Sequence, residues 1–163
     1  VTLVHDGPDV PVAEVRRVES AAEMTAATTE ACADADALLS AAAISDYTVE
    51  QRDRKIKSGE PSLTLELSPT PKLVDTVRSE RPELPIVGFK AETDVDDETL
   101  VERAREIRDR VDMEFVVAND AAVMGDDETR TLFVDADDAV AFAGTKTELG
   151  GEIAARLSAA LDG

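Results

Sequence analysis

The residues best suited to chemistry lie in and beside a basic loop, in a chain that is otherwise strongly acidic. A short apolar run ends at Asp46, and the loop that follows it carries four cations, Arg52, Arg54, Lys55 and Lys57. A carboxylate can contact a sugar, a base or a metal ion, and basic side chains can bind phosphate groups. The pattern predicts a polyphosphate site. The alternative is a solvated hairpin loop whose basic residues pair with acidic neighbours.

Strands and helices are expected to alternate along the chain, which predicts an α/β fold. We expect a Rossmann-like, three-layer domain with a mostly parallel central sheet and helices on both faces. Strands are expected at 1–4, 15–18, 37–44, 63–67, 86–89, 115–118, 130–134 and 139–142, and helices at 20–34, 70–80, 94–111 and 145–161. Ser20 with Glu23, and Thr145 with Glu148, have the spacing of capping boxes. Thr70 is expected to cap the second helix, with Pro71 at its first position.

Several polar or aromatic residues follow the expected strands directly, and ligands of parallel sheets bind at the carboxyl ends of strands. These residues are Asp46, Thr70 with Pro71, Phe89, and Asn119 with Asp120. Their positions predict one composite site beside the basic loop. Packing in the core would also account for Phe89, and a role in a turn would account for Asn119 and Asp120.

Composition limits the classes of function that fit this chain. Its 163 residues suit one domain, and a net charge of −19 disfavours binding to nucleic acid. Abundant Asp and Glu with few Lys predict a halophilic protein from a salt-rich cytoplasm. A single Cys32, expected to be a packing residue, and a single His5 argue against a zinc site or a Ser-His-Asp triad. The absence of a long apolar segment or signal peptide predicts a cytoplasmic protein that does not bind membranes.

Five motifs resemble, in the same order, those of the phosphopantothenoylcysteine synthetase family. The ending GTKTELGGEIAARL at 144–157 is also similar, so the resemblance covers nearly the whole chain. This family forms the second enzymatic half of the bifunctional coenzyme A biosynthesis protein. The motifs are AAAISDY at 41–47, KIKS at 55–58, SPTPKLV at 68–74, VGFKAET at 87–93 and VVAND at 116–120. A Gly-x-Gly-x-x-Gly fingerprint of dinucleotide-binding domains does not occur in the sequence.

The resemblance implies a ligase that condenses 4′-phosphopantothenate with cysteine. CTP with Mg²⁺ would activate the substrate carboxylate as an acyl-cytidylate, and the amine of cysteine would then release CMP. Members of the family form homodimers, so a homodimer is expected. FMN belongs only to the decarboxylase half, which lies outside this chain.

The resemblance also assigns roles to individual residues. Lys55 corresponds to the catalytic loop lysine that closes over the triphosphate. The nucleotide-binding positions are Ala42, Ala43, Asp46, Lys55, Thr70, Pro71, Lys72, Leu73 and Phe89. Candidates for the substrate side are Lys57, Asn119 and Asp120, and no metal ligand is assigned.

The sequence departs from the family pattern in three ways. The glycine-rich β-α unit that opens the synthetase domain does not precede Val1, so residues 1–163 are expected to be a single domain that lacks this unit. Thr70 and Lys72 replace an Asn and an Asp. Two lysines expected near Ile107 and Val111 are missing, and Arg105, Arg108 and Arg110 are candidate substitutes. The alternative function is a nucleotide-binding Rossmann-like module without catalytic activity of its own.

Overall fold

The computed structural model describes residues 1–49, 62–120 and 128–162, except for the side chains of Asp120 and Glu128. Its helices are α1 (Ala21–Ala31), α2 (Leu73–Glu80), α3 (Asp97–Val111) and α4 (Lys146–Asp162). Its strands are β1 (Thr2–His5), β2 (Glu14–Arg17), β3 (Leu38–Ser40), β4 (Tyr47–Val49), β5 (Leu67–Pro69), β6 (Ile86–Glu92), β7 (Phe115–Asp120), β8 (Glu128–Val134) and β9 (Ala139–Thr145).

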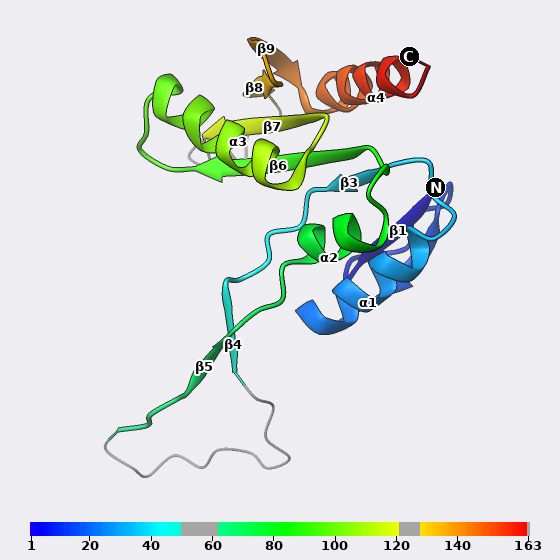
Figure 1. Ribbon diagram of the computed structural model, residues 1–163, viewed down its shortest axis with the longest axis vertical. Helices are drawn as coiled ribbons and strands as arrows, with labels where there is room; N and C mark the ends of the chain where they lie inside the picture. The colour runs from blue at the N-terminus through cyan, green and yellow to red at the C-terminus, as the bar shows by residue number, and fades with distance from the viewer. Residues whose placement is uncertain (50–61, 121–127, 163) are drawn as a thin grey trace.

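A five-stranded sheet forms the centre of the fold, in the order β3-β6-β7-β8-β9 (Figure 1). The strands β3, β6 and β7 are parallel, whereas β8 and β9 continue the sheet as an antiparallel pair. Helices cover both faces, so the expected α/β class is confirmed.

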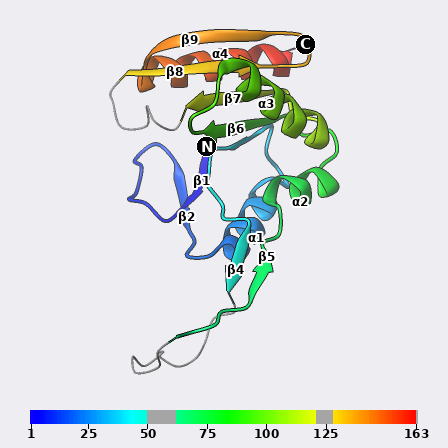
Figure 2. The same cartoon turned by 90° about the vertical axis from the view of Figure 1, so that its left-hand side faces the viewer.

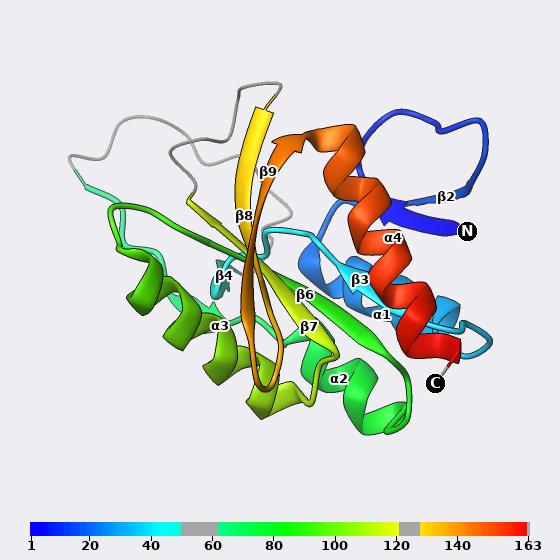
Figure 3. The same ribbon diagram turned by 90° about the horizontal axis from the view of Figure 1, so that it is seen from above.

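Apolar side chains fill the space on each side of this sheet. On one face, the core includes Leu73 and Val77 of α2, together with Leu100 and Ala104 of α3. On the other face, Ile153 and Leu157 of α4 pack over Val87, Phe115, Val117 and Phe133. Figure 3 shows α4 and α3 running along different sides of the sheet. Cys32 is buried in the first core, as expected for a packing residue, and burial raises the pKa of its thiol.

The strands β1 and β2 pair in parallel with each other but form no ladder with the central sheet among the described residues. Helix α1 packs against β1 and against α2, and in this way it joins the two parts. In Figure 2, β1, β2 and α1 lie on the α2 side of the central sheet. The arrangement differs from the single sheet that the sequence predicts.

A two-stranded arm, β4 paired with β5, projects away from the body (Figures 1 and 2). Val49 lies opposite Leu67 in this ladder, and Tyr47 lies opposite Pro69. Apolar side chains along the arm are about half exposed: Tyr47, Val49, Leu63, Leu65 and Leu67. The expected strand at 63–67 is wrong except for Leu67: the strand runs from Leu67 to Pro69, and residues 63–66 have no partner strand within the described residues.

The two predicted capping boxes are present. Ser20 accepts a hydrogen bond from the Glu23 amide, and Thr145 accepts one from the Glu148 amide. The predicted start of the second helix is wrong, because its N-cap is Lys72 rather than Thr70. The Thr70 amide instead donates to the Asp46 carbonyl, beside the β4–β5 ladder.

The predicted strand ends also need correction. Residues 41–44 lie outside β3, an edge strand that finds a partner in β6 only as far as Gly88. Asn119 and Asp120 do not follow a strand, because they are the last residues of β7 and pair with Ala91 and Glu92 of β6. Pairing with β6 extends β7 as far as Asp120, beyond the apolar segment 115–118 from which the sequence predicts the strand.

Two arginines fasten the helices at their C-terminal ends. The Arg78 guanidinium on α2 donates to the carbonyls of Val111 and Asp112, each at 2.8 Å, where α3 ends in a left-handed residue. It also donates to the Pro82 carbonyl. Arg81 donates to carbonyls at the end of α1, including that of Cys32. These donors satisfy carbonyl groups that have no partner within their own helices.

We expect Arg78→Met to lower the free energy of unfolding by about 2–4 kcal/mol, because several carbonyls lose a charged donor. Urea unfolding in molar KCl would measure the change. The matched control is Arg130→Met, which breaks an exposed ion pair with Asp97 and should cost less than about 1 kcal/mol. An equal effect of the two substitutions would contradict the structural role of Arg78.

Candidate functional site

A cavity of about 150 Å³ lies between the segment after β3, the start of α2, strand β6 and the end of α3. Its lining is mostly apolar, with hydroxyl groups at one side and cations at the rim. The lining residues are Ser40, Ala42, Ile44, Ser45, Thr70, Pro71, Lys72, Leu73, Val74, Gly88, Phe89, Ile107, Arg110 and Met113. We call it the apolar cavity.

Two residues give this cavity its shape. A Cβ atom added to Gly88 would lie 2.5 Å from the Met113 sulfur, so glycine leaves room for the Met113 side chain in the wall. Thr70 is 6% exposed, and its Oγ1 atom has no hydrogen-bond partner among the described residues. A buried hydroxyl without a partner costs free energy.

A second cavity, of about 430 Å³, adjoins the first and is lined by charged groups. We call it the charged cavity. Its lining residues are Lys90, Glu92, Arg103, Glu106, Ile107 and Arg110. Because Ile107 and Arg110 line both cavities, the α3 side chains form a shared wall.

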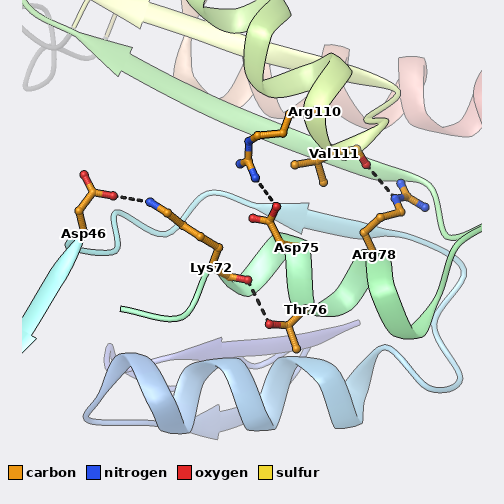
Figure 4. Close-up of polar contacts among 7 residues, drawn as sticks. All are labelled: Asp46, Lys72, Asp75, Thr76, Arg78, Arg110 and Val111. Atoms are coloured by element: carbon orange, nitrogen blue, oxygen red, sulfur yellow. Dashed lines mark hydrogen bonds and ion pairs between the residues drawn. The ribbon is translucent and has the colours of Figure 1, made fainter. Parts of the chain in front are cut away.

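Lys72 forms an ion pair with Asp46 at the rim of the apolar cavity (Figure 4). The hydrogen bond from Lys72 lowers the pKa of the Asp46 carboxyl, with a smaller contribution from the charge of Lys90. Both side chains are more than half exposed, so solvent screens the ion pair and it contributes little to the stability of the fold. Lys72 is also the N-cap of α2 but makes no side-chain capping bond, and it places a cation beside free backbone amides.

Glu92 holds two of the cations in the charged cavity. Its carboxylate lies 3.0 Å from Lys90 of the same strand and 2.6 Å from Arg103 of α3. The hydrogen bond from Lys90 is the main cause that lowers the pKa of Glu92. The side chain of Glu92 is 18% exposed, so this pair of contacts is better shielded from water than the pair at Asp46.

Six of the residues expected in the site line the apolar cavity: Ala42, Thr70, Pro71, Lys72, Leu73 and Phe89. Asp46 joins them through its ion pair with Lys72. Ala43 and Asn119 line neither cavity. Lys55, Lys57 and the side chain of Asp120 lie outside the described residues.

Sequence reasoning missed Lys90, Glu92, Arg103 and Glu106 as members of the site. Their spacing carried a signal, because Lys90 and Glu92 lie two apart on a strand, and Arg103, Glu106 and Arg110 recur at helical spacing. Such spacing also describes any solvated surface, so only the packing of α3 on β6 distinguishes this group.

Membrane spans and metal clusters are both absent from the part of the chain that the structure describes. None of the helices there combines the length and the apolarity that a crossing of a membrane requires. No three His, Cys, Asp or Glu side chains of the described residues come together as a metal-binding group.

The sequence is similar to two archaeal proteins named coenzyme A biosynthesis bifunctional protein CoaBC. The protein from Thermococcus kodakarensis is 40% identical over 142 residues, which are 84% of this chain and 35% of that protein. The protein from Methanocaldococcus jannaschii is 32% identical over 143 residues, which are 86% of this chain and 35% of that protein. The chain thus spans about a third of the length of these curated relatives.

Solved structures share the fold. The DNA/pantothenate metabolism flavoprotein from Streptococcus pneumoniae superposes with a TM-score of 0.84 at 22% sequence identity. The aligned part is 97% of this chain and 80% of the flavoprotein chain. The C-terminal domain of a coenzyme A biosynthesis bifunctional protein CoaBC has a TM-score of 0.75 at 21% identity, covering 99% of this chain and 74% of its own.

The similarity extends from single proteins to a whole family of domains. Residues 1–161 match the family described as the DNA/pantothenate metabolism flavoprotein C-terminal domain. The match spans both cavities and all described elements, and it agrees with the resemblance seen in the motifs. This chain therefore belongs to the DNA/pantothenate metabolism flavoprotein C-terminal domain family.

Proposed function

We propose that this domain is a phosphopantothenate–cysteine ligase of coenzyme A biosynthesis. It would join 4′-phosphopantothenate to cysteine through a CTP-derived acyl-cytidylate. The observation that carries the proposal is the apolar cavity opening onto a charged one, which suits a ligand with a flat ring and a polyphosphate chain. The names of the archaeal relatives support the pathway.

In this proposal the nucleotide base occupies the apolar cavity. Phe89 and Ile44 offer apolar contact to a ring, and Thr70, whose Oγ1 atom has no partner among the described residues, lies in the same wall. A volume of about 150 Å³ has room for a nucleobase. Ala42 leaves space for close approach of the ligand to the backbone.

The triphosphate would extend into the charged cavity, where cations stabilise charge that develops on the phosphates. Of the three arginines considered as substitutes for the missing lysines, Arg110 is the one that lines both cavities. Arg108 instead pairs with Asp109, and Arg105 donates to the Asp137 carbonyl. We therefore assign the phosphate contacts to Lys90, Arg103 and Arg110 and add Lys55 from the basic loop.

Mg²⁺ would arrive with the nucleotide, because it is usually held by substrate phosphates, waters and one or two carboxylates. Asp46 is a carboxylate of this kind at the cavity rim. When bound, Mg²⁺ would neutralise phosphate charge during activation. Lys57, Asn119 and Asp120 remain proposed contacts for the 4′-phosphopantothenate side, and FMN has no assigned place in this domain.

A nucleotide-binding module without turnover is the second candidate, and the free edges of β1 and β3 favour it. These two strands lie in separate sheets, and each lacks a ladder partner on one side among the described residues. A further strand paired along one of these edges would complete the sheet beside the site. Residues 1–163 by themselves would then bind the nucleotide without turning it over.

Calorimetry in molar KCl with Mg²⁺ would test the proposal. We expect CTP to bind more tightly than ATP or NAD, and Lys55→Ala to weaken binding without lowering the melting temperature. Ligation of 4′-phosphopantothenate to cysteine, assayed by release of CMP and pyrophosphate, would separate the ligase from the binding module. Equal affinity for all three nucleotides would contradict the assignment of the apolar cavity to cytosine.

The Asp46 carboxyl reports on its ion pair with Lys72. Its pKa in the folded domain is below the usual value, so the stabilising charge is present at neutral pH and is lost as pH falls through that pKa. We expect Lys72→Met to move the pKa of Asp46 upwards, toward that of an unpaired aspartate, in a carboxyl NMR titration. Asp97, whose pKa Arg130 lowers, should not move and serves as the control.

A second copy of the chain is the proposed partner of the arm, which gives a homodimer. An isolated two-stranded ribbon is marginally stable in water, and this one exposes apolar side chains on a projecting element. Pairing of two arms would bury them and use the free strand edges.

We expect Leu67→Glu to shift the chain toward the monomer in sedimentation equilibrium, because a carboxylate would be buried between the arms. Thr48→Glu adds the same charge to the other face of the arm, where Thr48 lies opposite Ser68, and should leave the dimer intact. A monomeric wild-type chain at all concentrations would rule out this role of the arm.

A further inference from the structure

Helices α2 and α3 are joined by a polar clasp on one side of the proposed site. Asp75 and Arg78 lie on the same face of α2, three residues apart, and both contact the last turn of α3. Asp75 forms an ion pair with Arg110, and Arg78 donates to the Val111 carbonyl (Figure 4). We call the residues Asp75, Arg78, Arg110 and Val111 the α2–α3 clasp.

The two α2 residues of the clasp, Asp75 and Arg78, differ in the kind of group that they contact. The Arg78 guanidinium donates to backbone carbonyls of Val111 and Asp112, and neither of these residues lines a cavity. Asp75 contacts a side chain, and that side chain lies in the wall shared by both cavities. Figure 4 shows Arg110 extending from α3 to meet Asp75, while Lys72, at the start of α2, points to Asp46.

We propose that Asp75 is a positioning residue that holds the Arg110 guanidinium in the shared wall, ready to bind a phosphate of the ligand. The inference rests on the proposed function, because the phosphate is that of the nucleotide. It goes further by assigning a role to a carboxylate that touches no ligand in that proposal.

The geometry of the ion pair is suited to this role. Within the described part of the chain, only Nη1 of Arg110 is engaged by Asp75, so Nη2 and Nε keep their capacity to donate to a phosphate. The Arg110 side chain is 46% exposed, and without Asp75 it would sample many rotamers in water. Ordering such a side chain on binding is costly, and a side chain already held in place avoids that cost.

The Asp75 side chain is 40% exposed, and its two oxygens differ in their surroundings. One of its oxygens, Oδ2, is buried and has no partner among the described residues, which is an unfavourable position for a carboxylate oxygen. The other oxygen contacts Arg110. A carboxylate in the first turn of a helix is favourable beside the free amides, and this offsets part of the penalty.

Calorimetric titration with CTP and with inorganic triphosphate tests the inference. We expect Asp75→Ala to lower both affinities about three- to tenfold, because Arg110 must then be ordered by the ligand. Alanine is well tolerated inside a helix, so the melting temperature should stay close to that of the wild type. Asp75→Glu keeps the charge and should restore most of the affinity.

A double-mutant cycle separates positioning from a general loss of structure. In an Arg110→Met background, Asp75→Ala should have no further effect on either affinity, whereas damage to the fold would persist there. The matched control is Asp97→Ala, which removes an exposed carboxylate paired with Arg130 near the start of α3 and should not change binding.

Three results would overturn the inference. These are unchanged binding by Asp75→Ala, tighter binding as expected of a carboxylate that competes with phosphate, or full affinity in Arg110→Met. Binding of inorganic triphosphate without preference for CTP would contradict the proposed function. The double-mutant cycle would still show whether Asp75 positions Arg110. A wild-type domain that binds neither compound would refute both.

Discussion

The seating of α2 beside α3, on one face of the central sheet, is the constraint on which the candidate site depends. Leu73 and Val77 anchor the helix in the core, and Arg78 fastens its C-terminal half to the end of α3. With both ends of this contact fixed, the first turn of α2 must lie beside β6 and form one wall of the apolar cavity. Core packing therefore sets the α2 wall of the cavity, and the segment after β3 supplies another part of its lining.

Charge in the site is balanced in pairs, although the chain carries a net charge of −19. Each cation that lines the two cavities has a carboxylate in contact: Lys72 has Asp46, Lys90 and Arg103 share Glu92, and Arg110 has Asp75. Such pairing keeps long basic side chains ordered in an acidic protein. An anionic ligand would meet cations that are already in place but also partly neutralised, so a divalent cation carried by the ligand would ease its entry.

Most of the fold could be predicted from the sequence, because apolar periodicity and capping residues are local signals. The boxes at Ser20 and Thr145 are predicted correctly, since a cap needs only residues three positions apart. The start of α2 is not, because the Thr70 amide is used by the Asp46 carbonyl, a partner far away in sequence. The extent of β7 likewise depends on its neighbour β6.

By itself, the sequence determined the α/β class, the family and the apolar wall of the candidate site, since short motifs such as those around Ala42, Thr70 and Phe89 are contiguous in the chain. Only the tertiary structure decided which cations join that wall. Lys90 and Arg103 look like ordinary surface residues in the sequence, and they join Arg110, one of three candidate substitutes for missing lysines, because α3 packs against β6. The sequence specifies the chemistry of each side chain and its near neighbours in the chain. Tertiary packing decides which side chains from different elements come into contact.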